Sequence, residues 1–176
     1  MKLVFISDIH GNIKNLPIIE KIDCDNLIVL GDLYHRYAEN SEVLNDEEVT
    51  NFILRNKEKI LCVKGNCDSE NDYKLLGLPC NEEIKILDNK NVLMCSHGNK
   101  LNYYHRSYAN EDCFVIYGHE HIPYIMPEGN TIYVCVGSIS NPRQGSSASY
   151  AVYDNGDIML FDISGKLISF YTKKKI

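Results

Sequence analysis

The sequence predicts an α/β fold in which two sheets pack together as an α/β sandwich, with helices packed outside and an antiparallel C-terminal half. In the first part of the chain, short apolar runs rich in Val and Ile alternate with helical stretches, which is typical of strands buried on both faces. After roughly residue 123, short alternating strands are separated by turns that contain Gly, which is typical of antiparallel hairpins. The two styles together indicate one layered unit, and we expect residues 1–176 to form a single domain.

The first half reads as a βαβαβα pattern. Helices are expected at Pro17–Ile22, where Pro occupies a tolerated first-turn position, at Asp46–Lys57, which has an acidic first turn, and at Ser69–Leu76. Ser69 is the expected N-cap of the last of these. The expected buried strands are Leu3–Ile6, Leu27–Leu30, Ile60–Val63, Val92–Cys95 and Phe114–Tyr117.

The second half reads as a β-meander. Its expected turns are Glu128-Gly129-Asn130, Asn155-Gly156-Asp157 and Ser164-Gly165-Lys166.

Composition excludes several classes of protein. Hydrophobic residues make up 44% of the 176 residues and charged residues 24%, close to the averages for a globular protein, which disfavours disorder. No apolar stretch approaches the roughly 20 residues of a membrane span, and Met1–Ile9 reads as a strand rather than a signal peptide, so a cytoplasmic protein with no membrane contact is expected. Seven cysteines, an odd number and mostly in apolar runs, fit a reducing compartment. The net charge of −6 argues against nucleic-acid binding by a basic face.

Each apolar run of the first part ends in a polar cluster. In α/β folds the carboxyl ends of parallel strands share one edge, where ligands bind, so clusters that lie far apart in the chain can converge there. Glycine accompanies each cluster, as expected where the backbone bends sharply or approaches a bound group. The clusters are Ser7-Asp8-Ile9-His10, Gly31-Asp32, Gly65-Asn66-Cys67-Asp68, Ser96-His97-Gly98 and Gly118-His119-Glu120-His121.

The side chains of these clusters form a metal-ligand list. Alone, an Asp-x-His or a His-x-His is weak evidence, but the ordered set, each member following a buried-type strand, is specific. A mixed oxygen and nitrogen set suits Mn, Fe, Zn, Co or Ni better than Ca or Mg. Seven ligands are too many for one ion and fit two ions if one carboxylate bridges them. The predicted ligands are Asp8, His10, Asp32, Asn66, His97, His119 and His121.

These motifs resemble those of the calcineurin-like metallophosphoesterases, whose pattern D-x-H, G-D, G-N-x-D/E, H-G, G-H-x-H matches this chain in order and over most of its length. Gly-Asn-Cys-Asp-Ser-Glu at 65–70, Gly-His-Glu-His-Ile-Pro at 118–123, Gly137-Ser138 and Pro142-Arg143 are most similar to the YfcE-like group of phosphodiesterases.

The resemblance implies how two divalent metal ions, Mn by expectation and Fe, Ni, Zn or Co as alternatives, are held. Asp8, His10, Asp32 and His121 would hold one ion. Asp32, Asn66, His97 and His119 would hold the other, with Asp32 as the bridge. The implied reaction is hydrolysis of a small phosphodiester by a hydroxide that bridges the metals, so that Asp32, Asn66 and His97 serve catalysis.

The chain departs from many of these enzymes at Cys67, where a His usually follows the motif Asn to assist the leaving group. A thiol is a poorer acid, and His35 or His105 could substitute. Cys67 is also a candidate reactive thiol, or a zinc partner of Cys62. Arg143 could contact the substrate phosphate with its planar donor fork.

Asn12 could orient the substrate, although Asn after Gly is equally an ordinary turn residue. A phosphomonoesterase or nucleotidase could use the same metal site. A scaffold like the retromer subunit that resembles these enzymes is the alternative from another class. Assembly into a homo-oligomer is left open by the sequence.

Overall fold

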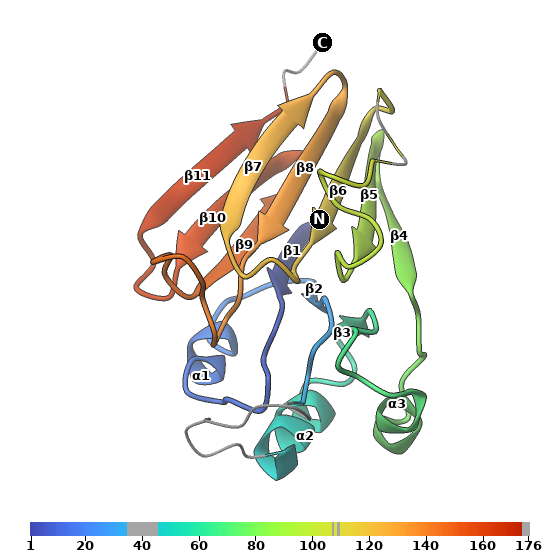
Figure 1. Cartoon of the computed structure of the whole chain (residues 1–176), viewed down its shortest axis with the longest axis vertical. Coiled ribbons are helices and arrows are strands. Elements are labelled where there is room, and N and C mark those ends of the chain that lie inside the picture. The colour runs from blue at the N-terminus through green and yellow to red at the C-terminus, as the bar shows by residue number, and fades with distance from the viewer. Residues whose placement is uncertain (35–45, 107, 109, 174–176) are drawn as a thin grey trace.

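The structure of the protein is a computed structural model that describes residues 1–34, 46–106, 108 and 110–173. Within these ranges the chain forms strands of two sheets and a small number of helices (Figure 1). The strands are Lys2–Ile6 (β1), Asn26–Val29 (β2), Ile60–Cys62 (β3), Glu83–Asp88 (β4), Asn91–Ser96 (β5), Cys113–Tyr117 (β6), Pro123–Glu128 (β7), Thr131–Val136 (β8), Ser149–Asp154 (β9), Asp157–Asp162 (β10) and Leu167–Thr172 (β11). The helices are Leu16–Ile19 (α1), Asp46–Arg55 (α2) and Glu70–Leu76 (α3).

The first sheet has the order β11-β10-β9-β1-β2-β3, and the second has the order β4-β5-β6-β8-β7. In the first sheet β1, β2 and β3 are parallel, and β9 pairs antiparallel with β1. In the second sheet β5, β6 and β8 are parallel, while β4 and β7 are antiparallel edge strands. The predicted α/β sandwich is confirmed. The first sheet is parallel from β1 to β3 and antiparallel from β9 to β11, and the second sheet has a parallel centre between two antiparallel edge strands.

The predicted C-terminal meander divides between the two sheets. All three predicted turns are present, since they separate β7 from β8, β9 from β10, and β10 from β11. However, β7 and β8 belong to the second sheet, whereas β9, β10 and β11 extend the first. The strands therefore follow one another in the chain without forming one continuous antiparallel sheet.

Alternation along the central strands separates two hydrophobic layers. Leu3 and Phe5 of β1 pack between the two sheets, against Phe114 and other side chains of the second sheet. Val4 and Ile6 face the opposite way and pack against the helices. Because successive side chains of a strand point to opposite faces, a run of four apolar residues is buried on both sides.

The helices are amphipathic and cover the outer face of the first sheet; in Figure 1 they lie in the lower part of the view. Ser69 is the N-cap of α3, as predicted, and its backbone amide donates a 2.7 Å hydrogen bond to the side chain of Asp72. Gly77 ends this helix in the left-handed conformation. In the part of the chain that the structure describes, no helix has the length and the apolar character needed to cross a membrane.

Candidate metal centre

The predicted ligands lie in loops that follow β1, β2, β3, β5 and β6. Because β1, β2 and β3 are parallel in one sheet and β5 and β6 are parallel in the other, their carboxyl ends can deliver side chains to one edge of the sandwich. The structure brings the predicted ligands together there, as the following contacts show.

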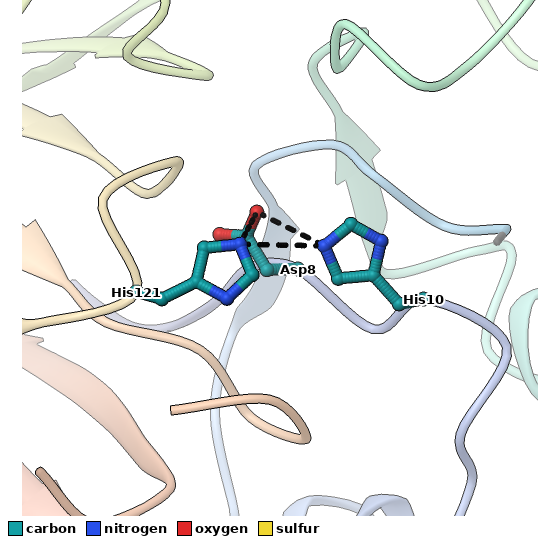
Figure 2. A group of neighbouring side chains, drawn as sticks. All are labelled: Asp8, His10 and His121. Carbon is teal, nitrogen blue, oxygen red and sulfur yellow. Dashed lines mark hydrogen bonds and ion pairs between the residues drawn. The ribbon is translucent and has the colours of Figure 1, made fainter. Parts of the chain in front are cut away.

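Asp8, His10 and His121 form the first half of the centre (Figure 2). The Nε2 atom of His121 lies 3.1 Å from Oδ1 of Asp8 and 3.4 Å from Nε2 of His10. His10 Nε2 lies 3.6 Å from the same carboxylate oxygen. In Figure 2 the two imidazole edges face each other with the carboxylate beside them, so three ligand-type atoms surround one small volume.

His97, Asn66 and His119 form the second half. Nε2 of His97 lies 2.9 Å from Oδ1 of Asn66 and 3.2 Å from Nδ1 of His119. The two histidines of the His119-x-His121 motif thus serve different halves of the centre, because both adopt positive φ angles and the loop does not continue as an extended strand.

Asp32 connects the two halves. Its Oδ2 atom lies 3.8 Å from Nε2 of His10 and 3.4 Å from Nε2 of His97. Its other oxygen, Oδ1, accepts a 2.8 Å hydrogen bond from the backbone amide of Cys67. One carboxylate oxygen is therefore within reach of histidines from both halves.

Backbone strain is concentrated at these positions. Non-glycine residues with positive φ are uncommon, and each costs about 1–2 kcal/mol. Side chains held in such a conformation often serve a site that needs them there. The affected predicted ligands, with their φ angles, are Asp8 (56°), His10 (47°), Asp32 (53°), His119 (64°) and His121 (61°).

Neighbouring carbonyl groups orient the imidazoles of His97 and His121 so that Nε2 faces the centre. The Nδ1 atom of His97 donates to the carbonyl of Leu30 at 2.7 Å, and Nδ1 of His121 donates to the carbonyl of Asn141 at 2.5 Å. Such a bond fixes the ring orientation and strengthens the other nitrogen as a metal ligand.

The loop after β8 holds the backbone of Asp8 by hydrogen bonds. Hydroxyls of Ser138 and Ser140 each donate a 2.8 Å hydrogen bond to the carbonyl of Asp8. The Gly137-Ser138 motif, quoted above for the family resemblance, therefore contributes a buried hydroxyl that holds a predicted ligand.

Asp68 has a role that sequence analysis did not assign. Its carboxylate accepts hydrogen bonds from the backbone amides of Asp32 at 2.9 Å, Leu33 at 2.8 Å and Gly65 at 2.9 Å. The hydroxyl of Tyr73 donates to it as well, at 2.9 Å. The sequence signal that could have indicated this role is the position of Asp68 as the last residue of the Gly-Asn-x-Asp motif. Its carboxylate joins two loops that carry predicted ligands.

The charge distribution matches a cation site. Burial would raise the pKa of Asp8, but the adjacent imidazoles of His10 and His121 hold the pKa of this carboxyl well below its usual range. Burial would lower the pKa of His97, but the hydrogen bond to Asp32 and the charges of Asp8 and Asp32 raise it to about 9.

The donor set fits divalent metal ions. Two overlapping groups of carboxylate and imidazole atoms, Asp8 with His10 and His121, and Asp8 with Asp32 and His97, are close enough to share an ion. Among the described residues, Oδ1 of Asp8 is one of the few buried side-chain atoms that accept no hydrogen bond of normal geometry. A buried carboxylate oxygen beside two imidazoles and without a hydrogen bond is the arrangement that a cation satisfies.

The remaining candidates are placed as follows. Cys67 lies with His10 and Asp32, and burial together with the charge of Asp32 raises its pKa to about 12, which disfavours a reactive thiolate. The side-chain oxygen of Asn12 accepts a 3.0 Å hydrogen bond from the amide of Lys14, which is a turn contact. Arg143 is exposed on the rim of a cavity beside His119. His105 is exposed, and His35 lies outside the described residues.

Comparison with known proteins identifies the family. The model of the calcineurin-like phosphoesterase superfamily domain matches residues 1–157. Phosphodiesterase YfcE of Escherichia coli K12 is 30% identical over 175 residues, which cover 96% of this chain and 95% of the relative. The probable metallophosphoesterase YsnB of Bacillus subtilis is 26% identical, with the same shares covered.

Solved structures agree. The structure of YfcE from E. coli superposes with a TM-score of 0.89 at 30% identity, covering 98% of this chain and 99% of that one. Vacuolar Protein Sorting 29 from Cryptosporidium parvum, at 14% identity and a TM-score of 0.67 over 98% of both chains, shares the fold alone. The family match and the similarity over nearly the whole chain show that the protein belongs to the calcineurin-like phosphoesterase superfamily and is a metal-dependent phosphoesterase.

Proposed function

We propose that this chain is a two-metal phosphodiesterase that hydrolyses small phosphate diesters, with residues 1–176 acting as one metallophosphoesterase domain. In this proposal one metal ion is held by Asp8, His10, Asp32 and His121. The second is held by Asp32, Asn66, His97 and His119. The observation that carries the proposal is the position of Oδ2 of Asp32, which lies within 4 Å of Nε2 of both His10 and His97.

We propose Mn as the metal, with Fe, Ni, Zn or Co as alternatives. Two such cations, when bound, would supply an activated water and neutralise the charge of the phosphoryl group. The chain's own residues set the positions. Asp32 is the bridging carboxylate. Asn66 is exposed whereas His97 is buried, so we propose that the phosphoryl oxygens approach from the side of Asn66.

We favour a diester over a monoester because of the similarity to phosphodiesterase YfcE, and the centre adjoins a cavity that can hold an ester group. The cavity has a volume of about 600 Å³, and His119 is part of its wall. This room is enough for an ester group attached to the phosphoryl group. Of the two predicted substrate contacts, the proposal keeps Arg143, which lines the cavity, and assigns Asn12 to the turn that its side chain stabilises.

The neutral thiol of Cys67 leaves the chain without a strong acid at the position where many relatives have His. We therefore propose that esters with good leaving groups, which need no protonation, are the better substrates. The centre lies in a protein of net charge −6, and bound cations offset the repulsion that this charge exerts on an anionic ester.

The proposal is tested by stripping the protein of metal and measuring hydrolysis of an aryl phosphodiester and of the matching monoester, with each candidate metal added back. Diester hydrolysis should return with Mn and exceed monoester hydrolysis. Asp32→Ala and His97→Ala should each abolish it, while Asp23→Ala, at an exposed position, should not. Folded protein that hydrolyses neither ester with any metal would instead favour a non-catalytic scaffold, and preference for the monoester would favour a phosphomonoesterase or nucleotidase.

A further inference from the structure

The cavity beside the metal centre has a wall that the reaction itself does not use. Tyr104, Glu120, Tyr124 and Arg143 line it, and His119 joins it to the centre. A group esterified to a phosphate at the centre would have to lie against these side chains. Their chemistry therefore bears on which ester the site selects.

The carboxylate of Glu120 is held in one orientation by a chain of hydroxyls. The hydroxyl of Tyr124 lies 3.0 Å from both oxygens of Glu120 and can only donate to an ionised carboxylate. Its 2.7 Å contact with the hydroxyl of Tyr117 is then one in which Tyr117 donates. The Tyr117 oxygen in turn accepts a 3.0 Å hydrogen bond from the amide of Tyr103.

The chain of hydroxyls supplies one donor proton to the carboxylate of Glu120, which can accept about four hydrogen bonds. Glu120 is only half-buried, and it lines the cavity. Among the described residues only Tyr124 donates to Glu120, so its carboxylate keeps acceptor positions for whatever occupies the space. A ligand that brings N–H or O–H donors would satisfy them, whereas an apolar group would desolvate the carboxylate without replacement.

An aromatic side chain provides a second surface. Tyr104 is 72% exposed, unusually so for a large ring, yet its backbone is fixed, because its amide donates a 2.8 Å hydrogen bond to Oδ1 of Asn102. Asn102 is itself buried and donates to the carbonyl of Gly98 at 2.7 Å. An exposed ring on a cavity wall, carried by a hydrogen-bonded backbone, is suited to stacking against a planar group.

Arg143 contributes the opposite charge. Its backbone is tied to the centre, since its amide donates to the carbonyl of His121 at 3.1 Å and its carbonyl accepts from the hydroxyl of Ser146 at 2.7 Å. Arg143 lines the same cavity as Glu120. It offsets the repulsion that the carboxylate would exert on the phosphodiester, so the two charges make the cavity polar without excluding an anion.

We propose that this cavity is a specificity site for one ester group of the diester, a planar ring that carries N–H or O–H donors, as a nucleoside does. The ring stacks on Tyr104, and its donors bind Glu120. This inference rests on the proposed phosphodiesterase function and adds the class of substrate to it.

The test uses three diesters that share p-nitrophenol as the leaving group and differ in the second ester, which is methyl, phenyl or a nucleoside. The Mn-loaded protein should show kcat/KM values that rise from methyl to phenyl to nucleoside, with at least about tenfold between the extremes. Tyr104→Ala should reduce the preference of both rings over methyl, and Tyr104→Phe should restore it. Glu120→Ala should reduce the preference of nucleoside over phenyl.

Matched controls are Phe170→Ala, which removes a ring that is 62% exposed on β11, and Glu47→Ala, which removes an exposed carboxylate on α2. Neither should change the ratios. Equal kcat/KM values for the three diesters, or ratios that survive in the Tyr104 and Glu120 variants, would overturn the specificity site while the phosphodiesterase function stands.

A binding measurement separates the two proposals. Calorimetry should show that a nucleoside monophosphate binds the Mn-loaded protein more tightly than methyl phosphate does, and that Tyr104→Ala and Glu120→Ala remove the difference. If no diester is hydrolysed but this difference is found, the phosphodiesterase function fails and the binding site stands. If the two phosphates bind equally, the inference is wrong whatever the activity.

Discussion

The carboxylate of Asp68 accepts a 2.9 Å hydrogen bond from the backbone amide of Asp32, so one motif carboxylate holds the backbone of another. Its further bonds to the amides of Leu33 and Gly65 join the loop after β2 to the loop after β3. The position of Asp32 between the two halves of the centre therefore depends on a residue that sequence analysis treated only as part of a motif.

Asp68→Asn should destabilise the metal-free protein by about 3 kcal/mol, because an amide group cannot accept all of these hydrogen bonds and its NH₂ opposes the backbone donors. The free energy of unfolding in denaturant measures the change. Tyr73→Phe is the matched control, since it removes the hydroxyl that donates to Asp68 and should cost only about 1 kcal/mol. Equal stability of Asp68→Asn and the unsubstituted protein would show that the carboxylate does not hold the two loops.

Gly65→Ala should prevent the centre from forming. A Cβ atom at this position would lie 2.1 Å from Oδ1 of Asp32 and 2.2 Å from its amide nitrogen, so the carboxylate that we propose as the bridge would have to move. We expect a loss of stability of about 3 kcal/mol and loss of bound metal. Gly165→Ala, where no atom lies within 4 Å of the added Cβ but φ is +85°, should cost about 1 kcal/mol and keep the metal. The metal content can be measured by elemental analysis. A Gly65→Ala protein that keeps its full metal content would contradict this account.

Metal content should distinguish the two halves of the centre. Because His121 contacts Asp8 and His10 whereas His119 contacts His97, replacing either histidine by Ala should remove one of the two ions we propose. Asp32→Ala should lower the occupancy of both, since its Oδ2 faces both halves. Elemental analysis after dialysis checks the numbers. A protein that binds at most one ion per chain, with or without these substitutions, would refute the two-metal assignment.

The apparent metal affinity should rise with pH between 7 and 8.5. In the metal-free protein the pKa of His97 is raised to about 9, so the imidazole is protonated below this pH. A metal at Nε2 must displace that proton, and affinity should therefore increase by up to about tenfold per pH unit until the pKa is passed. Calorimetric titrations in buffers of different ionisation enthalpy measure the released proton, and His97→Ala should release fewer. A metal affinity that stays constant over this pH range would contradict the raised pKa of His97.

Much of the fold could be predicted from the sequence. The five predicted buried strands correspond to β1, β2, β3, β5 and β6, and the three predicted helices are present, although α1 is shorter than expected. β4 was not predicted, because its apolar residues Ile84 and Ile86 alternate with charged ones at the edge of a sheet. The pairing of β8 with β6 and of β9 with β1 could not be read from the sequence, because both are long-range contacts that local turns do not encode.

The same distinction holds for the centre. The residue types of the predicted ligands and their positions after strands are local properties, because continuous apolar runs indicate buried strands and the polar side chains follow them directly. The grouping of His121 with Asp8, of His119 with His97, and of Asp32 with both depends on loop conformations with positive φ and on the packing of two sheets. The supporting contacts of Asp68 and Ser138 likewise join segments that the chain separates. The sequence by itself thus determined most of the strands, the ligand types and the family resemblance. Only the tertiary structure decided which ligands share a volume and what lies beside them. The physical reason is that those contacts are made across space, between loops whose geometry no local pattern specifies.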